Sequence, residues 1–277
     1  MIGIFDSGLG GLTILNALKK KLPDYHYVYL ADSGRAPYGN KSKKIIYKYT
    51  RQAINFLFAK KCEIVILACN TASATSLRKI QRKYLPKYYP NKKVLGIVVP
   101  NIEVILKHLS KTKNKKPNII GIMATKATIK SRSYQKEFNK IKTNTEVYSL
   151  SCPKLVPLIE KNKSDSSDLY ESLGKYLKIF KKRKVQAIIL ACSHFPILKE
   201  KMNKLLENKI NIIDTSDDIA GKTKQYLEKH SDIKRKLIKD KKIEFYTSGD
   251  VKNFKNMAKK ILKQKINKVD FVNLKNH

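Results

Sequence analysis

Short apolar runs recur along this chain and are separated by longer stretches with helical spacing, and this alternation is the feature that most limits its fold. The runs are dense in Ile, Val and Leu without apolar–polar alternation, as at 64–68. Such runs mark strands buried on both faces, as in a parallel sheet. Between them apolar residues recur every three or four positions, as at Leu12, Leu15, Leu18 and Leu22. The pattern predicts an α/β fold with largely parallel sheets.

The periodicity also places the individual elements. Strands are expected at 2–5, 26–30, 64–68, 94–98, 118–123, 145–149, 187–191, 210–213 and 243–247. Helices are expected near 11–21, 43–60, 72–84, 101–109, 127–140, 167–182, 197–206, 217–229 and 251–264.

A weak internal repeat suggests that the chain contains two related units. The segment 66–71 (ILACNT) matches 189–194 (ILACSH), so that an apolar strand ends in Ala-Cys in both places. Upstream, 3–7 (GIFDS) loosely echoes 121–125 (GIMAT). The repeat predicts two α/β domains, each with a cysteine at the end of a strand, although chance similarity is an alternative for so few positions.

The charge balance is extreme, with 59 Lys and Arg against 22 Asp and Glu, a net charge of +37. A nucleic-acid partner is one explanation, and compositional drift in an AT-rich genome is another. The lysines are spread along the whole chain, almost avoid the polar loops described below, and accompany no aromatic–basic or zinc-finger motif. We therefore expect nucleic-acid binding that is at most nonspecific and confined to low salt.

The sequence carries no sign of a membrane segment, a leader or a metal site. Its apolar runs are too short to cross a bilayer, and it opens directly on a strand-like run without a signal-peptide pattern. A cytoplasmic location is expected. The four cysteines form no C-x-x-C pair, and no H-E-x-x-H occurs, so we expect no metal ligation and free thiols.

Four polar loops follow predicted strands, where ligands bind in open α/β sheets. The first loop is glycine-rich but lacks the final glycine of a dinucleotide fingerprint, which is Thr13 here. Its helix N-terminus would suit a substrate carboxylate, and an ordinary glycine turn is the alternative. The loops are 6–11 (DSGLGG), 32–39 (DSGRAPYG), 69–73 (CNTAS) and 192–196 (CSHFP).

Cys69 and Cys192 each follow a buried strand and precede a predicted helix start. A cysteine in that place feels the positive end of the helix dipole, which is expected to lower its pKa. Asn70, Thr71 or Ser193 would cap these helices. A lone cysteine is more often structural, but two in matched contexts favour catalysis.

Each thiol has a candidate proton partner, His194 for Cys192 and Asp6 for Cys69. A single nucleophilic cysteine is a competing interpretation, but it leaves the second cysteine unexplained. Two thiols that face one carbon would form a racemase, because inverting a stereocentre requires a proton removed from one face and another delivered to the opposite face. A thiol titrates near enough to neutrality to act as acid or base.

At this point the motifs resemble the glutamate racemases of the aspartate/glutamate racemase superfamily, and the resemblance covers almost the whole chain. Its specificity comes from several segments in a fixed order. These segments are 5–11 (FDSGLGG), 31–39, 68–74 (ACNTASA), 152–160, 192–196 (CSHFP) and 245–250 (FYTSGD).

The resemblance implies that Cys69 and Cys192 are the two proton donors and acceptors, and that Asp6, His194 and Glu160 assist proton exchange. It implies no cofactor and no metal, and a D-glutamate product that supplies peptidoglycan synthesis. It further implies substrate contacts from Asp6, Ser7, Tyr38, Gly39, Asn70, Thr71, Thr125, Thr128, Ser193 and His194.

Together with the internal repeat, the resemblance implies two pseudo-symmetric domains with the active site between them. The first would be discontinuous, comprising 1–96 plus 208–277, and the second would span 97–207.

The chain departs from the family pattern at Ala191, Ser193 and Phe195, where Gly, Thr and Tyr are usual. None of these departures removes a catalytic group.

Three questions stay open at this stage. An aspartate racemase of the same superfamily is the alternative enzyme, and a basic nucleic-acid-binding protein without activity is the alternative of a different class. The oligomeric state is undetermined, a homodimer being one option beside the small-molecule partner glutamate.

Overall fold

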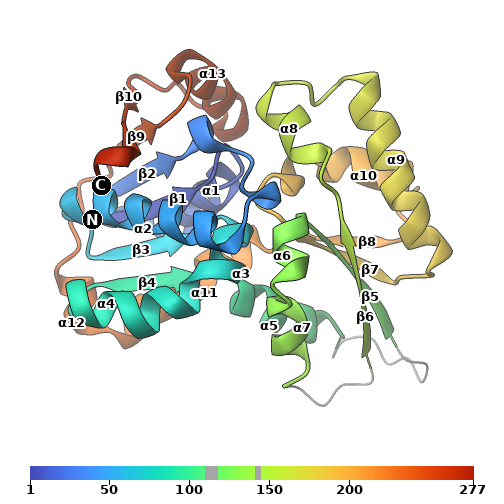
Figure 1. The fold of residues 1–277 in the computed structure, drawn as a ribbon, viewed down its shortest axis with the longest axis horizontal. Coiled ribbons are helices and arrows are strands. Elements are labelled where there is room, and N and C mark those ends of the chain that lie inside the picture. The colour runs from blue at the N-terminus through green and yellow to red at the C-terminus, as the bar shows by residue number, and fades with distance from the viewer. Residues whose placement is uncertain (110–117, 141–144) are drawn as a thin grey trace.

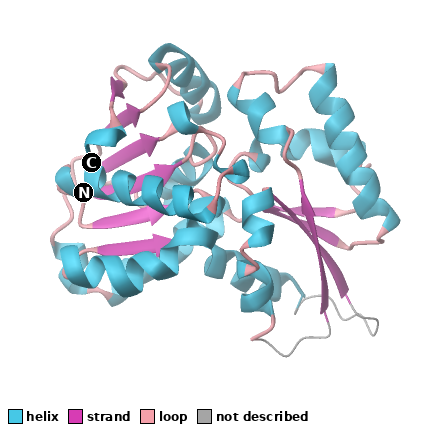
Figure 2. Cartoon of the chain, in the orientation of Figure 1, coloured by secondary structure: helices cyan, strands magenta, loops and turns pink. Residues whose placement is uncertain are grey.

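The computed structural model describes residues 1–109, 118–140 and 145–277, and these form two sheets surrounded by helices (Figures 1 and 2). All paired strands within both sheets are parallel. The predicted α/β class with largely parallel sheets is therefore confirmed. No helix in the described part of the chain has the length and apolar character needed to span a membrane.

The first sheet has the strand order β10-β9-β2-β1-β3-β4. In the register, Asp6 lies opposite Ala31 and Phe5 lies opposite Leu67. The loops that begin at Asp6, Asp32 and Ala68 therefore leave the same edge of the sheet. The strands are β1 (Ile2–Asp6), β2 (Tyr27–Ala31), β3 (Ile64–Leu67), β4 (Lys93–Gly96), β9 (Ile243–Thr247) and β10 (Asp270–Phe271).

The second sheet has the strand order β6-β5-β7-β8. Ala124 lies opposite Ala191, so Thr125 and Cys192 follow neighbouring strands at one edge. The strands are β5 (Asn118–Ala124), β6 (Thr145–Ser151), β7 (Ala187–Ala191) and β8 (Asn211–Ile213).

Helices cover both faces of the first sheet, as the burial of its strands requires. Alternate residues of β1 face opposite cores: Ile4 packs in one with Leu15, and Phe5 in the other with Leu57. The helices nearest this sheet in sequence are α1 (Leu12–Lys21), α2 (Lys43–Ala59), α3 (Asn70–Lys79), α4 (Leu85–Tyr88), α11 (Ser216–Lys229), α12 (Ser231–Arg235) and α13 (Val251–Leu262). The remaining helices are α5 (Val98–Leu109), α6 (Lys126–Lys130), α7 (Ser133–Phe138), α8 (Leu155–Glu160), α9 (Ser167–Lys182) and α10 (Lys199–Leu205).

Most element predictions agree with the structure to within a few residues, and the differences have local causes. The helix expected at 127–140 is divided into α6 and α7, because Arg132 adopts a left-handed conformation with φ of 56°. The short elements β10, α8 and α12 were not predicted, since two to six residues carry too little periodicity.

The two sheets draw on different parts of the chain, and both termini lie beside the first sheet (Figure 1). Its strands fall within 2–96 and 243–271, and those of the second within 118–213. β8 pairs with β7, so the second sheet continues past the boundary placed at 207. The division into folding domains at 96 and 208 stays a prediction.

Candidate active site

The predicted site residues converge where the loops of the two sheets meet, and almost all are enclosed by protein. The Glu160 side chain is 14% exposed, and Gly39 is buried. None of the other side chains is more than 6% exposed: Asp6, Ser7, Tyr38, Cys69, Asn70, Thr71, Thr125, Thr128, Cys192, Ser193 and His194. The structure is therefore a closed form, in which solvent hardly reaches these groups.

Cys69 lies at the N-terminus of α3. Its sulfur accepts a hydrogen bond from the backbone N–H of Ala72 at 3.5 Å, and its thiol donates to Ser7 Oγ at 3.3 Å. Cys69 itself is thus the cap, whereas Asn70 and Thr71, predicted as caps, lie inside the first turn. The helix position was predicted correctly, but the capping residue was not.

The expected lowering of the Cys69 pKa is wrong for the closed protein. Burial raises the pKa of this thiol to about 12, and the nearby charge of Asp6 acts in the same direction. The hydrogen bonds that Cys69 forms with Ser7 and Ala72 oppose the shift without cancelling it. Desolvation of a thiolate outweighs the helix terminus here, so Cys69 rests as a protonated thiol.

The raised pKa predicts slow alkylation of Cys69 in the substrate-free protein. At pH 8 a thiol with a pKa of about 12 holds roughly a thousandfold less thiolate than one at the ordinary value of 9.0. Iodoacetamide labelling followed by peptide mass spectrometry should give a rate at least about a thousandfold below that of free cysteine. Urea-unfolded protein is the control, and labelling of folded Cys69 at the unfolded rate would contradict the assignment.

Cys192 heads a chain of three polar groups. Its sulfur lies 3.9 Å from Nδ1 of His194, and Nε2 of His194 contacts Oε1 of Glu160. The same Glu160 oxygen accepts the backbone N–H of Leu9 at 2.8 Å. Burial disfavours the charged imidazole, but hydrogen bonds to Cys192 and Glu160 outweigh it and raise the pKa of His194 well above its ordinary value. The predicted pairing of His194 with Cys192 is present in the structure.

Asp6 forms its hydrogen bonds with the Cys192 loop and with Gly8, while its charge also acts on the Cys69 thiol, so its pairing with Cys69 stays a prediction. Its Oδ1 accepts from Ser193 Oγ at 2.8 Å, and its Oδ2 accepts the backbone N–H of Gly8 at 2.9 Å. Ser193 therefore does not cap a helix; the short turn Phe195–Leu198 follows His194 without a side-chain cap. Burial raises the pKa of Asp6, while the positive charge of His194 partly offsets this effect.

The remaining predicted residues form two polar groups around the thiols. The hydroxyls of Thr71, Thr125 and Thr128 lie within 2.9–3.3 Å of one another. The Tyr38 hydroxyl contacts Asp32, and a Cβ atom at Gly39 would lie 2.6 Å from Thr125. All these residues lie where the two sheets meet. The Tyr38 hydroxyl already donates a hydrogen bond to Asp32, and the sequence had not indicated Asp32 as its partner.

The glycine-rich loop serves a close approach between the two parts of the chain. A Cβ atom at Gly10 would lie 2.4 Å from the backbone N of His194, and one at Gly8 would lie 1.9 Å from Glu160. No glycine in the described residues has positive φ. Gly10 is therefore required for space against the backbone of the Cys192 loop, and an alanine at Gly8 would have to displace the Glu160 carboxylate.

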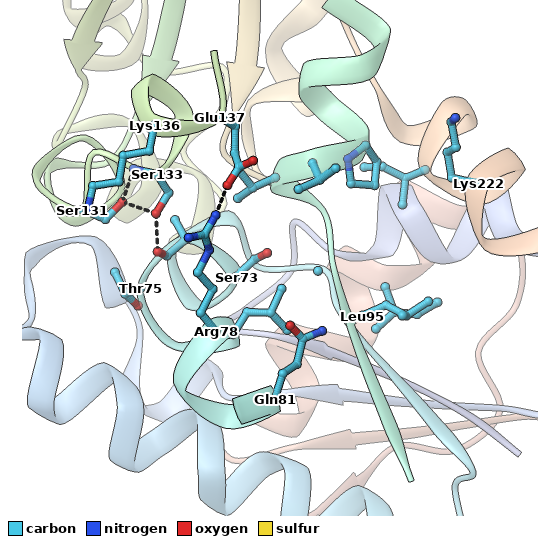
Figure 3. A pocket seen from close by; sticks show the side chains of 18 of the residues that line it. Ser73, Thr75, Arg78, Gln81, Leu95, Ser131, Ser133, Lys136, Glu137 and Lys222 are labelled. Atoms are coloured by element: carbon cyan, nitrogen blue, oxygen red, sulfur yellow. Dashed lines mark hydrogen bonds and ion pairs between the residues drawn. The ribbon is translucent and has the colours of Figure 1, made fainter. Parts of the chain in front are cut away.

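A cavity of about 560 Å³ lies beside the more C-terminal part of α3, and no predicted site residue lines it (Figure 3). Two contacts across it join α3 to α7. Arg78 pairs with Glu137, and Ser133 Oγ donates to the carbonyl of Ala74 at 2.5 Å. Among the described residues no cluster of His, Cys, Asp and Glu is suited to hold a metal.

A family model and a curated relative that match most or all of this chain are both racemases. The family model described as Asp/Glu/hydantoin racemase matches residues 13–220. Glutamate racemase 2 of Caldanaerobacter subterraneus subsp. tengcongensis is 35% identical over 276 residues, covering 100% of this chain and 98% of that protein.

Two solved structures share the whole architecture. A glutamate racemase isoform from Bacillus anthracis has a TM-score of 0.85 at 29% identity, covering 99% of this chain and 97% of that one. A glutamate racemase from Francisella tularensis, solved in complex with D-glutamate, has a TM-score of 0.84 at 29% identity, covering 100% and 98%.

Proposed function

The chain belongs to the Asp/Glu/hydantoin racemase family and is an amino-acid racemase, and from this premise we propose that it interconverts L-glutamate and D-glutamate with Cys69 and Cys192 as the two acid/base groups. One observation carries the mechanism. The two thiols follow strands of different sheets, and both are buried where these sheets meet. A substrate held between them would present one face of its α-carbon to each sulfur.

The proton balance follows from this arrangement. From L-glutamate, the Cys192 thiolate takes the α-proton, the C–H electron pair stays on the substrate, and the Cys69 thiol protonates the opposite face. Cys192 ends as a thiol and Cys69 as a thiolate. Reversal of these roles converts D-glutamate, and exchange with solvent restores the starting state. Cys69, with its raised pKa, is suited to the acid role.

His194, Glu160 and Asp6 support the Cys192 face. A protonated His194 stabilises the Cys192 thiolate, and Glu160 keeps the imidazole charged through its contact with Nε2. Asp6 holds the loop through Ser193. We assign all three to proton exchange at Cys192.

The substrate contacts come from polar groups that satisfy one another in the closed form. The hydroxyls of Thr71, Thr125 and Thr128 would exchange their mutual bonds for bonds to a substrate carboxylate. Ser7, Tyr38, Gly39, Asn70 and Ser193 complete the proposed binding set. The D-glutamate complex of the Francisella relative supports this substrate, and we infer that the product feeds peptidoglycan synthesis.

The direct test is incubation of purified protein with L-glutamate and no added cofactor, followed by chiral chromatography. The proposal requires D-glutamate to accumulate toward a racemic mixture. L-Aspartate is the comparison substrate. Absence of D-glutamate, or faster racemisation of aspartate, would overturn the assignment of substrate.

Replacing Glu160 with glutamine should change the pH dependence of L-glutamate turnover. The carboxylate contributes to the raised pKa of His194, so its loss lowers that pKa and neutralises the imidazole at lower pH. The alkaline limb of the kcat/KM profile should move to lower pH, with kcat reduced about tenfold. Glu103→Gln, which removes a surface pair with Lys222, is the control. An unmoved alkaline limb in Glu160→Gln would exclude this role.

A further inference from the structure

We propose that Tyr134 and Asn101 are positioning residues for racemisation, holding the amide of Asn70 so that it fixes the backbone at Cys192 relative to Cys69. The inference rests on the proposed two-thiol function. Neither residue belongs to the motifs that indicated the site, and both lie in predicted helices where nothing in the sequence distinguishes them.

Asn70 connects the two cysteine segments directly. It follows Cys69 in the chain and opens α3. With its amide oriented to satisfy both ends, its oxygen accepts the backbone N–H of Cys192 at 3.3 Å and of Ser193 at 3.2 Å. The opposite orientation would place the amide nitrogen against those two donors. One side chain thus joins the N-terminus of α3 to the end of β7.

Tyr134 and Asn101 determine which way that amide faces. In the satisfied orientation the Asn70 nitrogen donates to Tyr134 Oη at 2.6 Å. The side-chain amide of Asn101 lies 2.6 Å from the same hydroxyl and 3.2 Å from the Asn70 nitrogen, so its oxygen must face them, and its other end lies 2.6 Å from Thr215 Oγ1. The hydroxyl is therefore the acceptor that Asn70 needs for its nitrogen, which leaves its oxygen free for the Cys192 loop.

The network is buried throughout. Asn101 is fully buried, and Asn70, Tyr134 and Thr215 are at most 5% exposed. Burial also raises the pKa of Tyr134, which keeps it a neutral phenol. Because water does not replace a lost partner at such a site, removing one hydroxyl leaves Asn70 free to rotate. The Cys192 backbone would then lose its fixed distance from α3.

A matched pair of variants separates positioning from packing. Tyr134→Phe and Ser133→Ala each remove one hydroxyl that joins α7 to α3. Only Tyr134 contacts Asn70, whereas Ser133 Oγ donates to the carbonyl of Ala74. Figure 3 shows Ser133 directed toward α3 at the cavity, which no proposed site residue lines. The two variants should therefore differ in catalysis even where they lose similar thermal stability.

The measurement is kcat and KM in both directions, with the primary isotope effect on α-deuterated glutamate. Tyr134→Phe should lower kcat about tenfold in each direction, with KM changed less than about threefold, because misplaced reacting groups slow the chemical step. Its isotope effect should rise, since proton abstraction becomes more rate-limiting. Ser133→Ala should retain the wild-type kcat and isotope effect.

A double variant tests whether Tyr134 and Asn101 act through the same residue. Asn101→Ala alone should lower kcat, and adding Tyr134→Phe should lower it little further, because both changes release the same amide. Thermal melting confirms that each variant is folded at the assay temperature. Multiplicative losses in the double variant would refute a shared path through Asn70.

The outcomes also separate this inference from the function on which it rests. A wild-type protein that does not racemise glutamate refutes the proposed function. An active wild type whose Tyr134→Phe variant matches Ser133→Ala in kcat and isotope effect refutes only the positioning role. An active wild type with a selective loss in Tyr134→Phe supports both.

Discussion

Serine in place of either Cys69 or Cys192 is expected to reduce kcat by about 10²–10⁴-fold in both directions of glutamate racemisation. Each thiol acts as the base in one direction and as the acid in the other, so neither direction should escape either substitution. Serine keeps nearly the same shape, but its hydroxyl is a far weaker acid than a thiol and cannot supply the base at neutral pH. Steady-state assays from each enantiomer would measure the loss.

The other two cysteines provide matched controls, because they are also buried thiols. Burial raises the pKa of Cys62 to about 12, and that of Cys152 is raised by burial and by the charge of Cys192. A buried serine at either position should cost about 1–3 kcal/mol of stability while leaving kcat within about threefold of wild type. Near-normal turnover by Cys69→Ser or Cys192→Ser would refute the two-thiol mechanism.

Gly10→Ala should lower kcat about a hundredfold, the second large effect expected from this structure. The new Cβ atom would lie 2.4 Å from the His194 nitrogen and the Ser193 carbonyl carbon, and both are backbone atoms that no rotamer change can move. The Cys192 loop must therefore shift away from β1. We expect about 1–3 kcal/mol of lost stability, measured by urea unfolding.

Gly174→Ala is the control for that substitution. Gly174 lies within α9, and a Cβ atom there meets nothing within 4 Å. Alanine should stabilise the helix by about 0.5–1 kcal/mol without changing kcat. If Gly10→Ala behaved like Gly174→Ala, the close approach between the glycine loop and the Cys192 loop would not be required for catalysis.

The strands and most helices of this fold could be predicted because its parallel strands are continuous apolar runs. β1, β3 and β7 are each buried along their whole length, which produces an unmistakable pattern. The break at Arg132 and the short β10 escaped prediction, since one left-handed residue and a two-residue pairing leave no periodic signal.

The loops of the candidate site could be predicted from their place at strand ends, but their bonding could not. Proximity in the sequence suggested a Ser193 cap, whereas Ser193 donates to Asp6 from the other sheet. The direction of the Cys69 pKa shift was also missed, because burial depends on tertiary packing that a helix N-terminus alone does not reveal. Asn101 and Tyr134 gave no signal because isolated polar residues in helices are usually solvated.

The central claim is that two thiols act on opposite faces of one carbon, and racemisation of L-glutamate in D2O tests it most directly. Cys192 would remove the substrate's own proton, and Cys69, already exchanged with solvent, would deliver deuterium. Early in the reaction the D-glutamate should carry deuterium at Cα while the recovered L-glutamate stays mostly protiated. Deuterium entering the recovered L-glutamate as fast as the D-product would contradict the two-base account.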